Sequence, residues 1–227
     1  MKKTIAAVVC AAAAALSVQA HAEDAKVLRM ACESTYAPFV FFDSETGKLK
    51  GFEIDLLEYV AKEMGKLEVT NMGFDAIIPS MLTGITDVGA SAFTITPERA
   101  KRVLFSKPYY ISGLSILVRA EDKDKIKSVK DIENCTICAQ IGTSGSMRAA
   151  KVPGAKVRNF NTINDAYLEL GNKGCKAVIT DRPVTAYFLA ARPETAKTYY
   201  HLPTVLNSES FGFPVSKNKP ELMKAID

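Results

Sequence analysis

Histidine is scarce in this sequence of 227 residues, which contains only His21 and His201. A structural zinc site needs four cysteine or histidine ligands close together. Cys135 and Cys138 are spaced like half of such a site, but the other cysteines lie far away along the chain, and His201 is the only histidine beyond the N-terminal segment. The shortage of histidine therefore argues against a zinc site.

An excess of charge of one sign is lacking as well. The 29 basic and 25 acidic residues give a formal net charge of +4, and the basic residues are scattered with acids among them. A protein that binds nucleic acid would instead carry a basic patch or stripe. The composition, with 48% hydrophobic and 24% charged residues, is ordinary for a globular protein. We therefore expect no nucleic-acid partner.

The N-terminal apolar run, residues 5–18, is too short and too rich in alanine to favour a permanent membrane span. It follows two lysines and precedes the small residues of Ala20-His21-Ala22. This order is the pattern of a secretory signal peptide. The sequence therefore predicts a signal peptide over residues 1–22, which is removed after Ala22.

A predicted strand ends and a predicted helix begins within residues 91–99. Thr96 suits the N-cap of this helix, and Pro97 suits its first position. Arg99 then places a cation near the positive end of the helix dipole, which is unfavourable unless an anion compensates. A bound carboxylate would compensate it. The alternative is a salt bridge from Arg99 to Glu98 or to another acid.

Strands and helices alternate along the chain, which predicts an α/β fold with a mainly parallel sheet. The first set comprises strand 27–32, helix 52–64, strand 67–72, helix 76–82 with Asp75 as its cap, and strand 87–92. After the charged stretch 119–125, the second set comprises strand 136–140, helices from 147 and over 162–170, strand 177–180 and a helix from Pro183. A last helix begins at Pro220 with an unfinished apolar face, so we expect the sequence to be truncated at its C-terminus.

Eight motifs in succession resemble the polar amino-acid-binding family among the periplasmic solute-binding proteins of ABC importers. They are Tyr36-Ala-Pro-Phe39, Gly51-Phe-Glu-Ile-Asp-Leu56, Phe74-Asp-Ala-Ile-Ile-Pro79, Thr94-Ile-Thr-Pro-Glu-Arg99, Phe105-Ser-Lys-Pro-Tyr109, Gly142-Thr-Ser144, Ala177-Val-Ile-Thr-Asp181 and Phe211-Gly-Phe213. Each motif alone is weak evidence of kinship, but together they cover nearly all of the mature chain in the order of the family.

This resemblance implies a type II periplasmic binding fold. Two lobes, each with a mainly parallel sheet flanked by helices, would be joined by two crossover strands near residues 114–118 and 206–212. Lobe one would comprise residues 26–116 and 209–227, and lobe two residues 117–208. The implied function is capture of a polar or basic amino acid between the closing lobes, and delivery to an inner-membrane ABC permease. The resemblance implies a periplasmic monomer that needs no cofactor and is not an enzyme.

The resemblance also implies a ligand site of ten residues. They are Glu33, Tyr36, Phe74, Ser91, Ala92, Thr94, Arg99, Thr143, Ser144 and Asp181. The guanidinium of Arg99 would hold the α-carboxylate of the ligand, with help from Thr94 and from the loop that carries Thr143 and Ser144. The α-ammonium would be accepted by Asp181, together with Ser91 or the carbonyl of Ala92.

The remaining three residues would contact the ligand side chain. Tyr36 and Phe74 would sandwich it, and Glu33 would reach its polar end, which favours arginine, lysine, histidine or glutamine over glutamate. Simpler interpretations stay open for several residues. Asp181 would then only cap the following helix, Tyr36 and Phe74 would be core residues, and Glu33 would be a solvated loop acid.

The cysteines predict a disulfide. Cys135 and Cys175 each begin a predicted strand of the same lobe, and neighbouring parallel strands would bring them together, with Cys138–Cys175 as the alternative pair. A redox role for Cys135 and Cys138 is disfavoured, because a pair at the start of a strand places its sulfurs on opposite faces.

Two other classes of protein share the implied fold. Cyclohexadienyl dehydratases look similar and use the same cleft, so the fold alone does not exclude catalysis. No histidine lies near the candidate site, and charge matching explains Arg99 and Asp181 better than acid and base roles do. A receptor sensor lobe or a lytic transglycosylase would need a transmembrane or catalytic extension, and none is visible in this sequence, which we expect to be truncated at its C-terminus.

Overall fold

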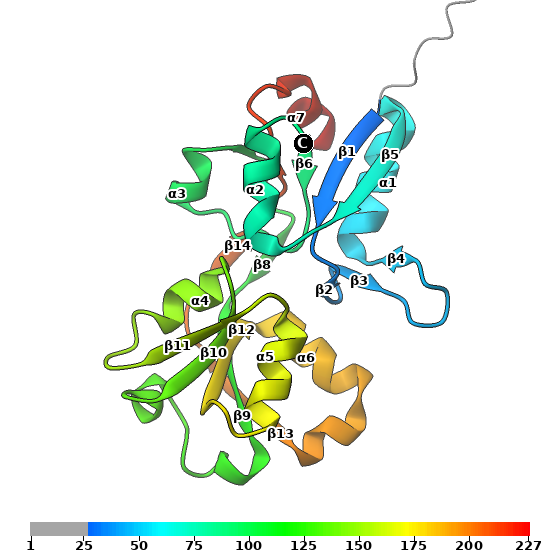
Figure 1. Cartoon of the computed structure of the whole chain (residues 1–227). Helices are drawn as coiled ribbons and strands as arrows, with labels where there is room; N and C mark the ends of the chain where they lie inside the picture. The colour runs from blue at the N-terminus through cyan, green and yellow to red at the C-terminus, as the bar shows by residue number, and fades with distance from the viewer. Residues whose placement is uncertain (1–26) are drawn as a thin grey trace, which may run out of the picture.

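The computed structural model describes residues 27–227, so the predicted signal peptide lies outside the described residues. These residues form two lobes joined at a narrow waist (Figure 1). Each lobe is built around a five-stranded sheet with helices packed against it. The predicted α/β, two-lobed fold is therefore confirmed.

In the sheet of the first lobe, the strand that comes first in the chain lies second from one edge. Its order is β5 (Lys66–Asn71), β1 (Val27–Cys32), β6 (Val88–Gly89), β15 (Pro214–Val215) and β7 (Leu104–Phe105). The pairs of β1 with β5 and β6 are parallel, whereas β15 runs antiparallel to both of its neighbours. A small antiparallel meander lies beside this sheet, made of β2 (Thr35–Tyr36), β3 (Val40–Phe42) and β4 (Leu49–Lys50).

Four helices belong to the first lobe. They are α1 (Phe52–Met64), α2 (Phe74–Leu82), α3 (Pro97–Ala100) and α7 (Pro220–Ile226). The predicted bounds of α1 are confirmed, because Ile54, Leu57 and Ala61 recur at helical spacing and are buried. The predicted cap of α2 is wrong. Gly73 occupies the N-cap position, and Asp75 lies inside the first turn, where its charge still meets the positive end of the helix dipole.

The second lobe repeats the pattern. Its sheet order is β11 (Lys156–Phe160), β10 (Thr136–Gln140), β12 (Ala177–Asp181), β9 (Leu114–Arg119) and β13 (Tyr199–Val205). Its helices are α4 (Ser144–Ala149), α5 (Ile163–Gly171) and α6 (Arg182–Ala191), with short 3-10 helices at Ala120–Asp122, Val129–Ile132 and Pro193–Lys197. β10 runs parallel to β11 and β12, whereas β9 runs antiparallel to β12 and β13.

The two lobes are joined by the antiparallel pair β8 (Tyr110–Ser112) and β14 (Glu209–Phe211) (Figure 1). The first crossover was expected near residues 114–118, and this prediction is wrong, because that segment is part of β9. All six residues of β9 are buried inside the second sheet, so its apolar run signals a sheet interior. The predicted boundary between residues 116 and 117 thus falls inside β9, while β14 lies within the second predicted crossover.

The disulfide joins Cys138 to Cys175, so the predicted pairing of Cys135 with Cys175 is wrong and the alternative is confirmed. Cys138 lies in β10 on the face that packs against α5, and Cys175 belongs to the same buried cluster. Ile137 faces the opposite side of the sheet. Since side chains alternate along a strand, Cys135 points away from Cys175 and is free.

Apolar packing continues from one lobe to the other. Tyr36 and Phe39 of the first lobe share a buried cluster with Tyr167 and Val184 of the second. The lobes therefore stand in a closed arrangement. Within residues 27–227, no helix is long and apolar enough to span a membrane, and no three potential ligands gather to hold a metal ion.

Candidate functional site between the two lobes

Nine of the ten predicted site residues line one narrow cavity between the lobes. They are Tyr36, Phe74, Ser91, Ala92, Thr94, Arg99, Thr143, Ser144 and Asp181. They come from segments at or just beyond the carboxyl ends of strands, where open α/β sheets place their ligands. The cavity is too narrow to admit a water molecule. An amino acid can therefore enter only when the lobes move apart.

Arg99 spans the interface between the lobes. Thr96 caps the short helix α3 by accepting from the Arg99 backbone N–H, which fixes where the arginine side chain starts. The guanidinium donates from Nη1 to the Thr94 carbonyl at 2.8 Å and from Nη2 to the Gly142 carbonyl, across the interface, at 3.0 Å. Burial lowers the pKa of Arg99, against the opposing influence of Asp181.

Two aromatic rings hold the Arg99 guanidinium. Its carbon lies 5.3 Å from the ring centre of Phe74 and 5.2 Å from that of Phe93, within cation–π range. Among residues 27–227, no acid lies within ion-pair distance of Arg99, so the alternative of a salt bridge to Glu98 is wrong. Arg99 is thus a buried cation whose partners are carbonyls and aromatic faces.

Asp181 ends β12 and faces the cavity from the second lobe, with only 2% of its surface exposed. Its carboxylate accepts from the Tyr36 hydroxyl and, at 3.3 Å, from the hydroxyl of Ser112. Asp181 occupies the N-cap position of α6, but its side chain makes no hydrogen bond to the start of that helix, so capping does not account for its carboxylate. Burial, followed by the negative charge of Glu209, raises the pKa of Asp181 to about 7.

Ser91 and Ala92 stand in an unusual backbone conformation, with φ of 120° and 52°. The buried carboxylate of Glu53 holds them there. Its Oε2 accepts from the backbone N–H of Ser91 at 2.9 Å and of Ala92 at 3.0 Å. Burial raises the pKa of Glu53 to about 7. Sequence reasoning missed this role, although an acid between apolar residues in the first turn of α1 was a usable signal.

Glu33 does not line the cavity. Its carboxylate is buried and accepts from Thr35 and, across the interface, from the side-chain amide of Gln140 at 2.9 Å. The solvated-acid interpretation is therefore wrong, and burial raises the pKa of Glu33. Gln140 was missed because its place at the end of β10 acquires meaning only when the first lobe packs on it.

Glu209 was also missed. It lies in β14, is 8% exposed, and accepts on Oε2 from the Thr94 hydroxyl at 2.6 Å and the Ser144 hydroxyl at 2.8 Å. On Oε1 it accepts from the Asn207 side-chain amide at 2.7 Å. No feature of the sequence around it marked the residue, because Thr94 and Ser144, whose hydroxyls it accepts from, lie more than 60 positions away.

Gly142 lets the loop before α4 approach the first lobe. Its φ of +75° is one that side chains rarely tolerate, and a Cβ there would lie 3.1 Å from the Cβ of Asp75 in α2. The close approach allows the Gly142 carbonyl to reach Arg99. A glycine is therefore required at this point of contact between the lobes.

Tyr36 and Phe74 are both core residues and cavity residues. Tyr36 belongs to the cluster shared by the lobes, and Phe74 stacks on Phe93 with ring centres 4.4 Å apart. Both also face the cavity. The two interpretations that the sequence left open are therefore compatible.

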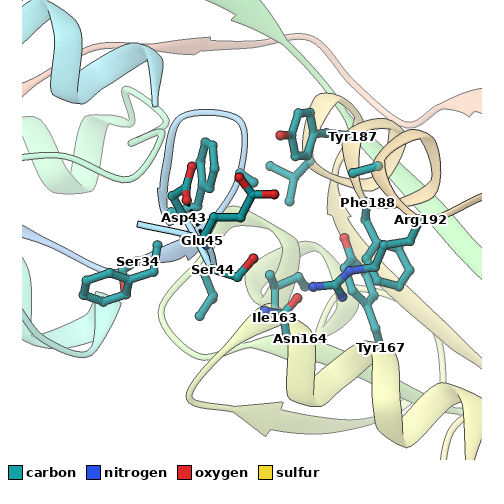
Figure 2. A pocket seen from close by; sticks show the side chains of 16 residues that line it. Ser34, Asp43, Ser44, Glu45, Ile163, Asn164, Tyr167, Tyr187, Phe188 and Arg192 are labelled. Atoms are coloured by element: carbon teal, nitrogen blue, oxygen red, sulfur yellow. Dashed lines mark hydrogen bonds between the residues drawn. The ribbon is translucent and has the colours of Figure 1, made fainter. Parts of the chain in front are cut away.

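A wider groove of about 560 Å³ lies next to the meander, with residues 43–45 on one side and Tyr187, Phe188 and Arg192 on the other (Figure 2). None of the ten predicted residues lines it. Arg192 there stacks over Phe188. The buried charges Arg99 and Asp181 face the narrow cavity instead, from opposite lobes, and such a pair can match the two charges of a zwitterion that leaves water.

Comparisons with known proteins reveal relatives that are similar in sequence and in fold. The sequence pattern of the bacterial extracellular solute-binding proteins, family 3, matches residues 28–227. The probable histidine-binding protein of Campylobacter jejuni is 33% identical over 193 residues, which are 85% of this chain and 73% of that protein.

Two solved structures extend the comparison. The arginine-bound form of truncated ArgBP from T. maritima is 35% identical, with a TM-score of 0.83 over 88% of this chain and 93% of that one. The ancestral amino acid-binding protein AncCDT-1, a precursor of cyclohexadienyl dehydratase, is 36% identical, with a TM-score of 0.80 over 88% of this chain and 86% of that one. Together with the match over residues 28–227, these likenesses show that the chain belongs to the bacterial extracellular solute-binding proteins, family 3.

Proposed function

We propose that this chain is the substrate-binding protein of an amino-acid ABC importer, and that it captures a polar or basic amino acid in the narrow cavity. Relatives named as histidine-, cystine- and arginine-binding proteins support the role. The observation that carries the proposal is the placement of Arg99 and Asp181 in one cavity, from opposite lobes. A zwitterion between them would have both charges matched.

The remaining site residues have proposed roles around that pair. Thr94, Thr143 and Ser144 would donate to the ligand carboxylate, and Ser91 with the Ala92 carbonyl would accept from its ammonium. Tyr36 and Phe74 would enclose the side chain. Glu33 would receive a polar side-chain end after Gln140 has moved away, which favours arginine, lysine, histidine or glutamine.

Binding would work by shifting a hinge population. The strands β8 and β14 are the connection about which the lobes would open. A ligand that touches both Arg99 and Asp181 favours the closed form by its extra contacts there. The importer would recognise that closed form, so the free energy of ligand binding is used for signalling to the permease.

The setting is part of the same proposal. The signal peptide predicted over residues 1–22 would direct export to the periplasm, and a family of extracellular proteins supports that location. The partner would be an inner-membrane permease, and the chain would act as a monomer.

Thermal unfolding of the mature protein against the twenty amino acids tests the proposal. A ligand at a hundredfold excess over its Kd should raise the Tm by about 5–10 °C. Arg99→Ala should remove this rise. No rise with any amino acid would overturn the proposed function.

A dehydratase is the second candidate. AncCDT-1 is itself an amino acid-binding protein, but it is described as a precursor of cyclohexadienyl dehydratase. The observation that favours a dehydratase is Asp181, a buried carboxyl whose pKa is raised to about 7 and which is therefore suited to proton transfer. The same unfolding assay with prephenate-like compounds, followed by product analysis, distinguishes the two. A rise and turnover with those compounds alone would favour the enzyme.

A further inference from the structure

Glu209 forms a junction between the lobes that the proposed ligand site does not explain. One carboxylate oxygen, Oε2, accepts from Thr94 of the first lobe at 2.6 Å and from Ser144 of the second lobe at 2.8 Å. The residue itself lies in the crossover strand β14, opposite Ser112 of β8. Three parts of the molecule therefore meet at a single oxygen atom.

The two hydroxyls at this junction belong to the proposed carboxylate subsite. A hydroxyl has one proton to donate, and Thr94 and Ser144 both direct theirs to Glu209. The nearby Arg99 is engaged in the same way, by the carbonyls of Thr94 and Gly142. A carboxylate inside the protein thus occupies the donors that a ligand carboxylate would need.

The charge of Glu209 points in the same direction. Its carboxylate is 8% exposed, and within residues 27–227 no cation lies at ion-pair distance from it. The positive charge of Arg99 acts on Glu209 only at longer range, where Glu209 opposes the burial that lowers the pKa of Arg99, so the direct partners of the carboxylate are two hydroxyls and an amide. A second carboxylate at the same hydroxyls would be repelled. Glu209 and a ligand carboxylate therefore cannot both accept hydrogen bonds from Thr94 and Ser144 at the same time.

We infer that Glu209 is an internal competitor of the ligand α-carboxylate, and that it holds the lobes together by taking the ligand's place on Thr94 and Ser144. The inference rests on the proposed function. Ligand binding requires Glu209 to release both hydroxyls and to keep Asn207 as its partner. Glu209 is thus a positioning residue that sets the affinity, and it lowers that affinity by stabilising a closed form without ligand.

Glu209→Gln tests the inference, because the amide keeps the shape and removes the charge. Calorimetry would compare L-arginine, L-lysine and L-histidine with agmatine, cadaverine and histamine, the amines that lack the α-carboxylate. The variant should bind the amino acids about tenfold more tightly than the wild type does, since the charge-assisted bonds that must break are weakened. The amines leave Glu209 in place, so their affinity should not rise.

Glu98→Gln is the matched control. It removes the same charge from an exposed position inside α3, and within residues 27–227 the side chain of Glu98 makes no ion pair. Its affinity for the amino acids should equal that of the wild type. A tightening in this control equal to that in Glu209→Gln would overturn the inference, because general charge would then explain the effect.

X-ray scattering without added ligand measures how compact the protein is, independently of ligand binding. Glu209→Gln should show a larger radius of gyration than the wild type, because the junction between the lobes is weaker. If the variant unfolds, Glu209→Asp, which withdraws the carboxylate by one methylene, should show the same two changes. Equal compactness, or amino-acid affinity that is unchanged or weaker, would overturn the role of Glu209.

If the wild type binds none of the twenty amino acids, the proposed function fails, and the scattering result still decides whether Glu209 joins the lobes.

Discussion

The Tyr36 hydroxyl of the first lobe donates a hydrogen bond to the buried carboxylate of Asp181 in the second lobe. The same hydroxyl lies 3.1 Å from that of Thr180. Asp181 is thus already bound from across the cleft, in a cavity too narrow for water. A ligand ammonium at Asp181 would have to replace or share this bond, which links the chemistry of the site to the separation of the lobes.

Arg99→Ala is expected to cost about 2–5 kcal/mol of ligand affinity, because the ligand carboxylate loses a buried cationic partner. Isothermal calorimetry measures the loss, and circular dichroism checks that the variant is folded. Arg102→Ala is the control, since Arg102 is an exposed arginine just beyond α3 and its side chain makes no ion pair in the described part of the chain. Tight binding that survives in Arg99→Ala would refute the carboxylate role.

Amino-acid affinity should rise with pH. Burial and the charge of Glu209 raise the pKa of Asp181 to about 7, so below this pH the carboxyl is protonated and cannot pair with an ammonium. Binding an ammonium then requires loss of a proton, and the affinity should increase up to tenfold per pH unit until about pH 7. Titrations from about pH 5 to about pH 8 measure this slope. Asp181→Asn should bind weakly with no such slope, and a slope that persists in that variant would assign it to another group.

Glu53→Ala should destabilise the fold by about 2–4 kcal/mol, because two buried N–H groups, those of Ser91 and Ala92, lose their acceptor. Denaturant unfolding measures the change. Glu58→Ala, on the exposed face of the same helix, should stay within about 0.5 kcal/mol of the wild type. Equal effects of the two substitutions would show that Glu53 does not hold the strained loop.

Gly142→Ala should weaken ligand binding by about 1–3 kcal/mol, because the added Cβ crowds Asp75 only when the lobes are closed. Gly84→Ala is a close match. Its φ of +76° is almost the same, but nothing lies within 4 Å of the added carbon. Both substitutions should lower stability through backbone strain, by about 1–2 kcal/mol. Calorimetry distinguishes the two variants by their ligand affinity. Unchanged affinity in Gly142→Ala would argue against the contact with Asp75 in the ligand-bound form.

Reduction of the Cys138–Cys175 disulfide should lower the free energy of unfolding by about 2–4 kcal/mol, because a closed loop restricts the unfolded chain. Cys175→Ala should have a comparable effect, and Cys135→Ala should change little because Cys135 is free. Thermal unfolding with and without a reductant measures the differences. A larger loss from Cys135→Ala than from Cys175→Ala would contradict the pairing, as would a disulfide peptide that contains Cys135.

Long periodic segments were predictable from the sequence. The bounds of α1 agree with prediction because apolar residues recur at helical spacing, and the bounds of β10 agree although its residues form a short buried run without alternation. The strand expected over residues 87–92 covers only Val88–Gly89. Ser91 and Ala92 leave the extended conformation, held by a carboxylate that precedes them by almost forty positions. Local pattern cannot reveal such a partner.

The sequence by itself determined much of the order of the elements and the succession of motifs that resembles the family, and that resemblance in turn implied the ten site residues. Periodicity, capping and motif order are local properties, whereas the grouping of nine of those residues in one cavity was decided by the tertiary structure. Only the tertiary structure decided that Arg99 meets carbonyls, that Glu33 meets Gln140, and that Glu209 holds Thr94 and Ser144. The reason is physical: each partner lies on another segment or on the other lobe, so a buried charge finds its donors only when the lobes pack together.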